Sequence, residues 1–200
     1  MEKESSILYL IRYTGLFAFI KPFAALRDER TMSSVYVPPT VIAGIEGHIF
    51  GNTAGRILRS RLVFSGISYQ QEIVQTAGFN RLAGKRYERN KSTLSRGLLL
   101  YPQLTLGFKQ LDWAQQAAQS WIMLSRREDI MLPQREIAQL TPELFDQLPG
   151  YECRERQSPG DGAVPMGYYE SGKPRYVLLV GTMNPLLERI QDTDLTLNWL

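Results

Sequence analysis

The stretch Val37-Pro38-Pro39-Thr40-Val41-Ile42-Ala43-Gly44-Ile45-Glu46-Gly47-His48-Ile49-Phe50-Gly51 predicts a helix whose start and end are both marked in the sequence. Pro39 suits the first helical position, because its fixed φ matches a helix and its missing amide hydrogen would have no partner there. Apolar residues then recur at helical spacing, at positions 41, 42, 45 and 49. Gly51 can end the helix in a left-handed conformation. We therefore expect a helix between Pro39 and Gly51.

Two glycines inside this predicted helix need an explanation. Gly44 and Gly47 should each cost roughly 1 kcal/mol relative to alanine. Together with His48 and Gly51 they form a second, nearly bare helix face. This face either packs closely against a neighbouring strand, or it is approached by a nucleic-acid backbone or a partner protein.

The segment before the helix predicts a strand and a long loop. From Ile7 to Phe19 apolar residues occupy both alternating faces, which favours a central strand that is covered at least partly on each side. Residues 21–36 are polar and irregular, and loops of this length are usually functional or disordered.

A basic stretch at residues 79–96 lies between two strand-like segments, Leu62 to Gln75 and Leu98 to Phe108. It carries six basic residues and one acid, interleaved with Phe79 and a tyrosine. Single-stranded nucleic acid is bound in this way, with cations along the phosphates and rings stacked on bases. The alternative is a solvated loop without a ligand, although mixed charges would keep such a loop soluble equally well. The predicted RNA contacts in this hairpin are Arg81, Lys85, Arg86, Tyr87, Arg89, Lys91 and Arg96, with Phe79 or Tyr87 stacking.

The C-terminal part of the chain predicts short elements joined by loops. The expected elements are a helix at residues 112–119 with Asp112 as its N-cap, a strand at 121–124, a helix starting at Thr141-Pro142, a linker-like stretch at 149–175 and a buried strand at 176–180. This order of strands and helices is compatible with a ferredoxin-like α+β fold.

Composition bounds the chemistry and the compartment. Cys153 is the only cysteine and His48 the only histidine among 200 residues, so we expect no disulfide, no metal site and no cofactor. The charged N-terminus is unlike a signal peptide, and the apolar run from Ile7 to Ile20 is too short and polar to span a bilayer. We therefore expect a soluble, cytoplasmic protein.

Charge is distributed unevenly along the chain. Residues 1–127 hold 17 Lys and Arg against 8 Asp and Glu, whereas residues 128–200 hold 6 against 12. This asymmetry indicates a basic surface for a polyanion and an acidic portion that faces elsewhere, such as a basic protein partner.

Two segments carry a resemblance to a known family. The segment from Tyr13 to Pro22, followed by a polar loop and Pro38-Pro39-Thr40, resembles the CRISPR-associated RAMP superfamily. Within it the similarity is to the fifth (Cas-five-like) family, the subunit that caps the 5′ handle of the guide RNA in type I Cascade-like effector complexes. The segment from Trp121 to Asp129 resembles that family's strand and Gly-Arg-acidic turn, with Ser125 where glycine is usual. The resemblance covers roughly residues 7–130.

The resemblance implies one RAMP-like domain over residues 1–200, with a loop-rich acidic portion at about 128–200. Its fold would be a ferredoxin-like (RRM/RAMP-like) antiparallel sheet with helices on one face and a projecting basic β-hairpin thumb at about 79–96. The implied partners are the crRNA 5′ handle, the backbone and large effector subunits and, through the complex, target DNA. We add Lys21 to the expected RNA contacts, and the family-like turn adds Arg126.

We expect an RNA-binding subunit that is not an enzyme. The alternative is a metal-independent endoribonuclease, because some members of the family resemble enzymes that cut precursor RNA. Such an enzyme needs a base, an acid and a cation. His48 is expected to pack in the core or an interface, while Lys85, Arg86 and Tyr87 could supply a basic-plus-phenol site. A third possibility is an RNA-binding protein unrelated to this family.

Overall fold

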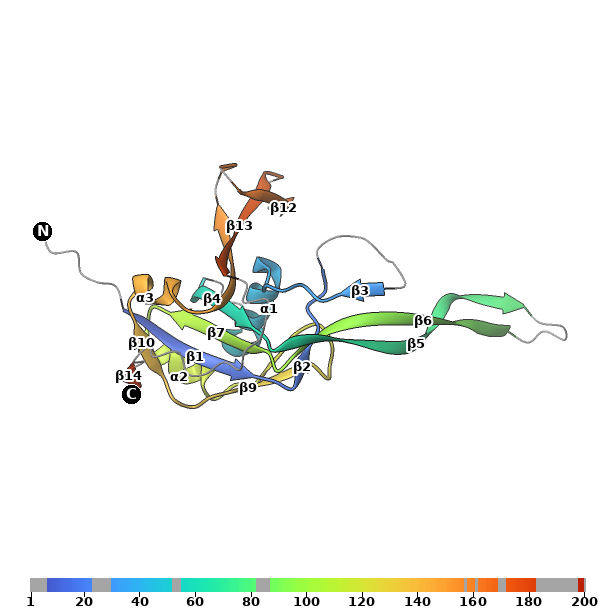
Figure 1. Cartoon of the computed structure of the whole chain (residues 1–200), viewed down its shortest axis with the longest axis horizontal. Coiled ribbons are helices and arrows are strands. Elements are labelled where there is room, and N and C mark those ends of the chain that lie inside the picture. The colour runs from blue at the N-terminus through green and yellow to red at the C-terminus, as the bar shows by residue number, and fades with distance from the viewer. Residues whose placement is uncertain are drawn as a thin grey trace, which may run out of the picture.

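The computed structural model describes residues 7–22, 30–51, 55–81, 87–156, 158–160, 162–168, 172–182 and 198–199. Most of these residues belong to two sheets in which nearly all neighbouring strands are antiparallel, with three short helices packed around them (Figure 1). The predicted α+β class is therefore confirmed.

The larger sheet is built around β1 (Leu8–Thr14). This strand pairs with β7 (Gln103–Phe108) on one side and with β10 (Ala138–Leu140) and β9 (Ile130–Pro133) on the other, so the prediction of a central strand is confirmed. Outward from β7 the order continues through β4 (Ile57–Val63), β11 (Gly150–Arg156), β13 (Pro174–Thr182) and β12 (Val164–Tyr168). Beyond β10 lies β14 (Asn198–Trp199), and β8 (Ile122–Met123) pairs with β9.

Helices cover both faces of this sheet, so the expectation of helices on one face was wrong. The residues of α1 (Pro39–Phe50) and α2 (Leu111–Ala117) share one core with Ile11 and Tyr13 of β1. The adjacent residue Leu10 points to the opposite face, where it packs with Phe145 of α3 (Pro142–Asp146). Alternating residues of one strand thus contact different helices, as a strand covered on both faces requires.

The predicted start of α1 is confirmed. Pro39 opens the helix and Gly51, with φ of 76°, ends it. In α3 the Thr141 hydroxyl accepts a hydrogen bond from the Leu144 amide, as its predicted N-cap role requires. In α2 the prediction was wrong by two residues, because Gln110 is the N-cap and Asp112 lies in the first turn.

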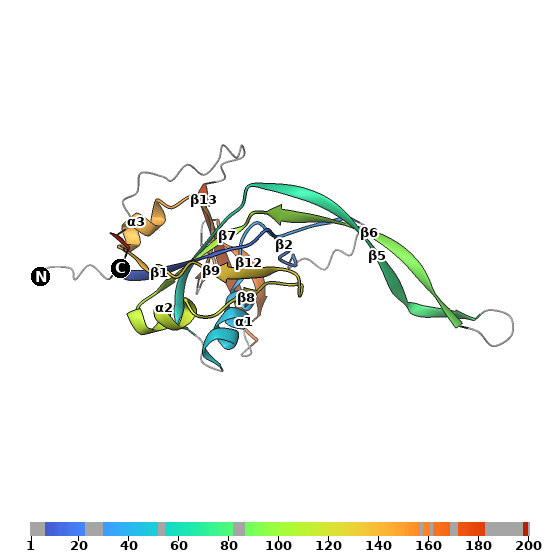
Figure 2. The same cartoon turned by 90° about the horizontal axis from the view of Figure 1, so that it is seen from below.

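A long two-stranded arm projects from the body of the molecule, as both views show (Figures 1 and 2). It consists of β5 (Gly66–Arg81) and β6 (Tyr87–Leu100). At its base β6 is flanked by β2 (Phe17–Ala18) and, in parallel, by β3 (Arg30–Met32). Most of the described part of the basic stretch at residues 79–96 is strand. Pairing of β6 with β5 satisfies the backbone hydrogen bonds of this stretch, so it needs no apolar core.

The single strand predicted from Leu98 to Phe108 is divided into β6 and β7. The division falls at Tyr101, which has φ of 46°, and at Pro102, whose nitrogen cannot donate a ladder hydrogen bond. The amide of Tyr101 instead donates to the Leu16 carbonyl, at 2.8 Å. The chain turns a sharp corner here as it leaves the arm for the sheet.

The linker-like interpretation of residues 149–175 was wrong, because most of the described part of this stretch is strand. Gly150, with φ of 98°, explains how the stretch joins the sheet: a Cβ there would lie 2.3 Å from the Leu62 carbonyl oxygen of β4. The predicted strand at residues 176–180 lies within β13, but Leu179 is exposed, so it is covered mainly on one face.

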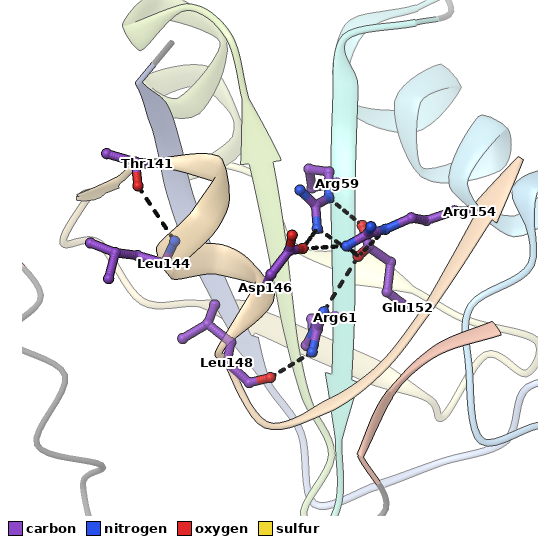
Figure 3. Close-up of polar contacts among 8 residues, drawn as sticks. All are labelled: Arg59, Arg61, Thr141, Leu144, Asp146, Leu148, Glu152 and Arg154. Carbon is purple, nitrogen blue, oxygen red and sulfur yellow. Dashed lines mark hydrogen bonds and ion pairs between the residues drawn. The ribbon is translucent and has the colours of Figure 1, made fainter. Parts of the chain in front are cut away.

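A network of ion pairs fixes β11 against β4 and α3 (Figure 3). The carboxylate of Glu152, which is buried, pairs with Arg59 at 2.5 Å, with Arg154 at 2.8 Å and with Arg61 at 3.4 Å. Asp146 pairs with Arg59 and Arg154. Figure 3 shows the Arg59 and Arg61 side chains of β4 on the same side of the strand. Arg59 contacts both carboxylates, whereas Arg61 contacts Glu152 and the Leu148 carbonyl.

Candidate nucleic-acid interface

The two faces of the arm differ in chemistry. In the β5–β6 ladder, directly opposite residues such as Ile73 and Thr93 share one face, and neighbours along a strand alternate between faces. The register shifts between Gln75 and Phe79 of β5, and on both sides of this shift odd-numbered residues lie opposite odd-numbered residues. We call the face of the odd-numbered positions the odd face and the other the even face. The contact of Arg89 with Phe79 on the odd face, and of Asn80 with Asn90 on the even face, agrees with this division.

The odd face combines cations with exposed rings. The Arg89 guanidinium lies 4.4 Å from the centroid of the Phe79 ring, and Tyr87 is 64% exposed. Lys91 is exposed one step further along the same face of β6. Near the base, the Arg30 guanidinium lies 4.1 Å from the centroid of the Tyr69 ring. Among the side chains described on the odd face of β5 and β6 there is no carboxylate.

The even face carries acids and paired arginines. The Glu72 carboxylate pairs with Arg96 at 2.8 Å and with Arg126 at 2.9 Å. Arg126 also pairs with Asp129 at 2.7 Å, and the hydrogen bonds to Asp129 raise the pKa of Arg126. Glu88 is exposed on the even face near the tip. Arg96 and Arg126, both predicted RNA contacts, thus already have carboxylate partners.

The structure brings three of the predicted RNA contacts together on the odd face: Tyr87, Arg89 and Lys91. Lys21 lies apart from them; it is exposed, and its amide donates to the Ser125 hydroxyl at 2.9 Å. The backbone of Arg81 pairs with Tyr87, but its side chain is not described, and Lys85 and Arg86 lie outside the described residues.

Sequence reasoning missed Arg30. It reaches the arm because β3 pairs in parallel with β6, placing Arg30 opposite Ser95. Nothing local to residues 30–32 in the sequence indicates this long-range pairing.

The bare face of α1 is exposed rather than packed. A Cβ at Gly44 or Gly47 would have no neighbour within 4 Å, so the interpretation that a strand packs there was wrong. His48 is also exposed, and its ring centroid lies 4.7 Å from that of Trp121. Of the two positions expected for His48, the core is therefore wrong, and packing in an interface stays a prediction.

The described residues form neither a metal site nor a membrane-spanning helix. In the described ranges no three His, Cys, Asp or Glu side chains come together in a way that could hold a metal ion. Of the helices in the described part of the chain, none has the length and hydropathy to cross a membrane.

Comparison with known proteins gives weak structural similarity and no match in sequence. No protein-family model matches the sequence, and no curated protein matches it. One solved structure that is similar to this chain is described as a "CRISPR RNA-guided surveillance complex", with 12% sequence identity, a TM-score of 0.48, and coverage of 88% of this chain and 90% of that chain. At this level of similarity, neither fold nor function is inferred from the match.

Proposed function

We propose that this protein is a non-catalytic RNA-binding subunit of a CRISPR effector complex, and that its arm holds the 5′ handle of the guide RNA. The proposal rests on the resemblance stated above and on the chemistry of the arm. Its partners would be the guide RNA and the neighbouring backbone and large subunits, with target DNA reached through the complex.

The observation that carries the proposal is the segregation of charge on the arm. Tyr87, Arg89 and Lys91 alternate along one face of β6, so neighbouring side chains are roughly 7 Å apart. A ring that can stack on a base thus lies beside two cations that can neutralise phosphates, a combination suited to binding single-stranded RNA. The carboxylates of the arm, Glu72 and Glu88, lie on the other face.

The order of the sheet supports a ferredoxin-like fold. The central strands are arranged β10-β1-β7-β4, with α1 between β1 and β4 in sequence and α2 between β7 and β10. This is the strand–helix–strand, strand–helix–strand pattern of a split βαβ fold. In this description the arm is an insertion between the second and third strands of the pattern, in the position of a thumb.

RNA binding by the arm is tested by its salt dependence. The change is alanine at Lys85, Arg86, Arg89 and Lys91 in the full chain, and the probe is a uridine oligomer of about 12 nucleotides. Each phosphate contact contributes about −0.7 to the slope of log affinity against log salt. The slope of the fourfold variant should therefore be less steep than that of the wild type by about 3.

A matched control removes charge elsewhere. Lys109 and Arg135 are exposed outside the arm, and alanine at both should leave the slope nearly unchanged. An arm variant with the wild-type slope would show that these cations do not contact RNA, and the proposed function would then be withdrawn.

A further inference from the structure

A cavity lies at the corner where the arm joins the sheet. Its volume is about 610 Å³, within the range of roughly 300–1,000 Å³ that is usual for ligand pockets. Strands β1, β7 and β9 line it through Thr14, Gln103 and Leu132, and Thr14 pairs directly with both of the others. Leu16 and Tyr101 belong to the two connections that meet at the corner.

The rim of this cavity is apolar and exposed. Leu16 is 71% exposed, Tyr101 61% and Leu132 59%. Tyr101 is also the one described non-glycine residue with positive φ. Such a conformation is strained for an aromatic residue and is usually kept where it has a use. In this conformation the Tyr101 ring lies beside the cavity and is exposed to solvent.

Two polar side chains of the cavity have no hydrogen-bond partner within the described chain. The side chains of Thr14 and Gln103 are half-buried, yet neither makes a side-chain hydrogen bond to any described residue. Glu128 also lines the cavity, held on one side by Arg126 at 3.4 Å. The cavity therefore offers an amide and a hydroxyl, which both donate and accept, and a carboxylate, which only accepts.

We infer that this cavity binds one unstacked base of the RNA, with guanine preferred. An aromatic ring with aliphatic neighbours is a surface on which a base stacks. Guanine presents two adjacent donors, N1–H and the N2 amino group, which match the two oxygens of the Glu128 carboxylate. Uracil presents a single donor there. The inference rests on the proposed function, because it assigns the arm to the RNA backbone and the cavity to a base.

The site also adjoins further cations. The backbone amide of Lys21 donates to the hydroxyl of Ser125, which lies in the same turn as Glu128. Arg127 is exposed and lies between Ser125 and Glu128 in sequence. These two cations can neutralise the phosphates beside a base in the cavity. Lys21, which lies apart from the odd face, would thus contact the same RNA strand as the arm.

The test compares two RNA probes on the full chain. One is a uridine oligomer of about 12 nucleotides, and the other has a single internal guanosine in place of uridine. We expect the guanosine oligomer to bind at least about fivefold more tightly, the lower limit for one bidentate base contact. Inosine, which lacks the N2 amino group, should retain only part of this preference.

Two substitutions then locate the preference. Glu128→Gln should remove it while leaving the affinity for the uridine oligomer the same or higher, because a negative charge is lost. Tyr101→Gly should also remove it, and because glycine accepts positive φ without strain, its folding can be checked by thermal unfolding. The inference would be overturned if the wild type bound the two probes with equal affinity, or if these variants lost affinity for both probes equally. The apolar rim would then be assigned to contact with a protein partner.

The outcome is separable from that of the proposed function. If the arm variant loses its salt slope but guanosine adds nothing, the cavity inference is wrong and the RNA grip of the arm stands. If the slope does not change in the arm variant, the proposed function itself fails.

Discussion

The Glu152 side chain is buried and pairs with three arginines. Burial by itself would raise the pKa of Glu152, but hydrogen bonds and charges from Arg59 and Arg154 outweigh it, so the pKa is lowered. The pKa of Asp146 is lowered by its hydrogen bonds to Arg59 and Arg154, on the exposed side of the network.

Replacing Glu152 with glutamine should lower the free energy of unfolding by about 3–5 kcal/mol, because Arg61 would be left buried without a charged partner. The measurement is urea unfolding at neutral pH. The lowered pKa gives the stabilisation its pH dependence: it is complete above the pKa of unfolded glutamate and is lost as pH falls through the folded value. The difference in free energy of unfolding between wild type and variant should shrink as the pH falls over this range.

Glu155→Gln is the matched control, because Glu155 is exposed and pairs with Arg175 near the surface at 2.8 Å. Such pairs contribute at most about 1 kcal/mol. Equal losses in both variants would show that the burial of Glu152 does not set its contribution.

At the scale of elements, the alternation of the arm allows its two faces to be tested separately. Gln70 and Gln71 are adjacent and both exposed, on the even and the odd face respectively. Gln71→Glu places a charge between Tyr69 and Ile73 on the proposed RNA path, so it should weaken binding of the uridine oligomer and reduce its association rate. Gln70→Glu adds the same charge opposite Arg96 and should have a smaller effect.

Fluorescence anisotropy at low salt, where surface charges are screened least, measures both affinities. A larger loss for Gln70→Glu than for Gln71→Glu would place RNA on the even face, contrary to the assignment made here.

At the scale of the whole molecule, the prediction that the protein does not cut RNA can be tested directly. The intact chain, incubated with a CRISPR repeat RNA and a chelator, should leave the RNA uncut, because the single histidine is on α1, against Trp121 with the two ring planes tilted by 56°. The readout is a denaturing gel. Metal-independent cutting that His48→Gln abolishes, in a variant that still unfolds cooperatively, would favour the endoribonuclease alternative.

Much of the local structure could be predicted from residues close in sequence. Pro39 and Gly51 mark the limits of α1, and Thr141 marks the start of α3, because helix ends depend on groups within a few residues of one another. The apolar residues on both faces of the first strand likewise indicated its central place. The basic and aromatic composition of residues 79–96 indicated the class of ligand.

The tertiary structure decided which side chains share a surface. It placed Arg30 beside Tyr69 through parallel pairing with β6, and it gave Arg96 and Arg126 a common partner in Glu72. Most of the described part of residues 149–175, which the sequence predicts as a linker, forms strands of the larger sheet. Each of these outcomes depends on contacts between residues far apart in sequence, whose geometry is set by strand register and packing. Composition and spacing therefore predict a ligand chemistry, whereas only the folded chain could separate cations that face solvent from those already neutralised by a carboxylate.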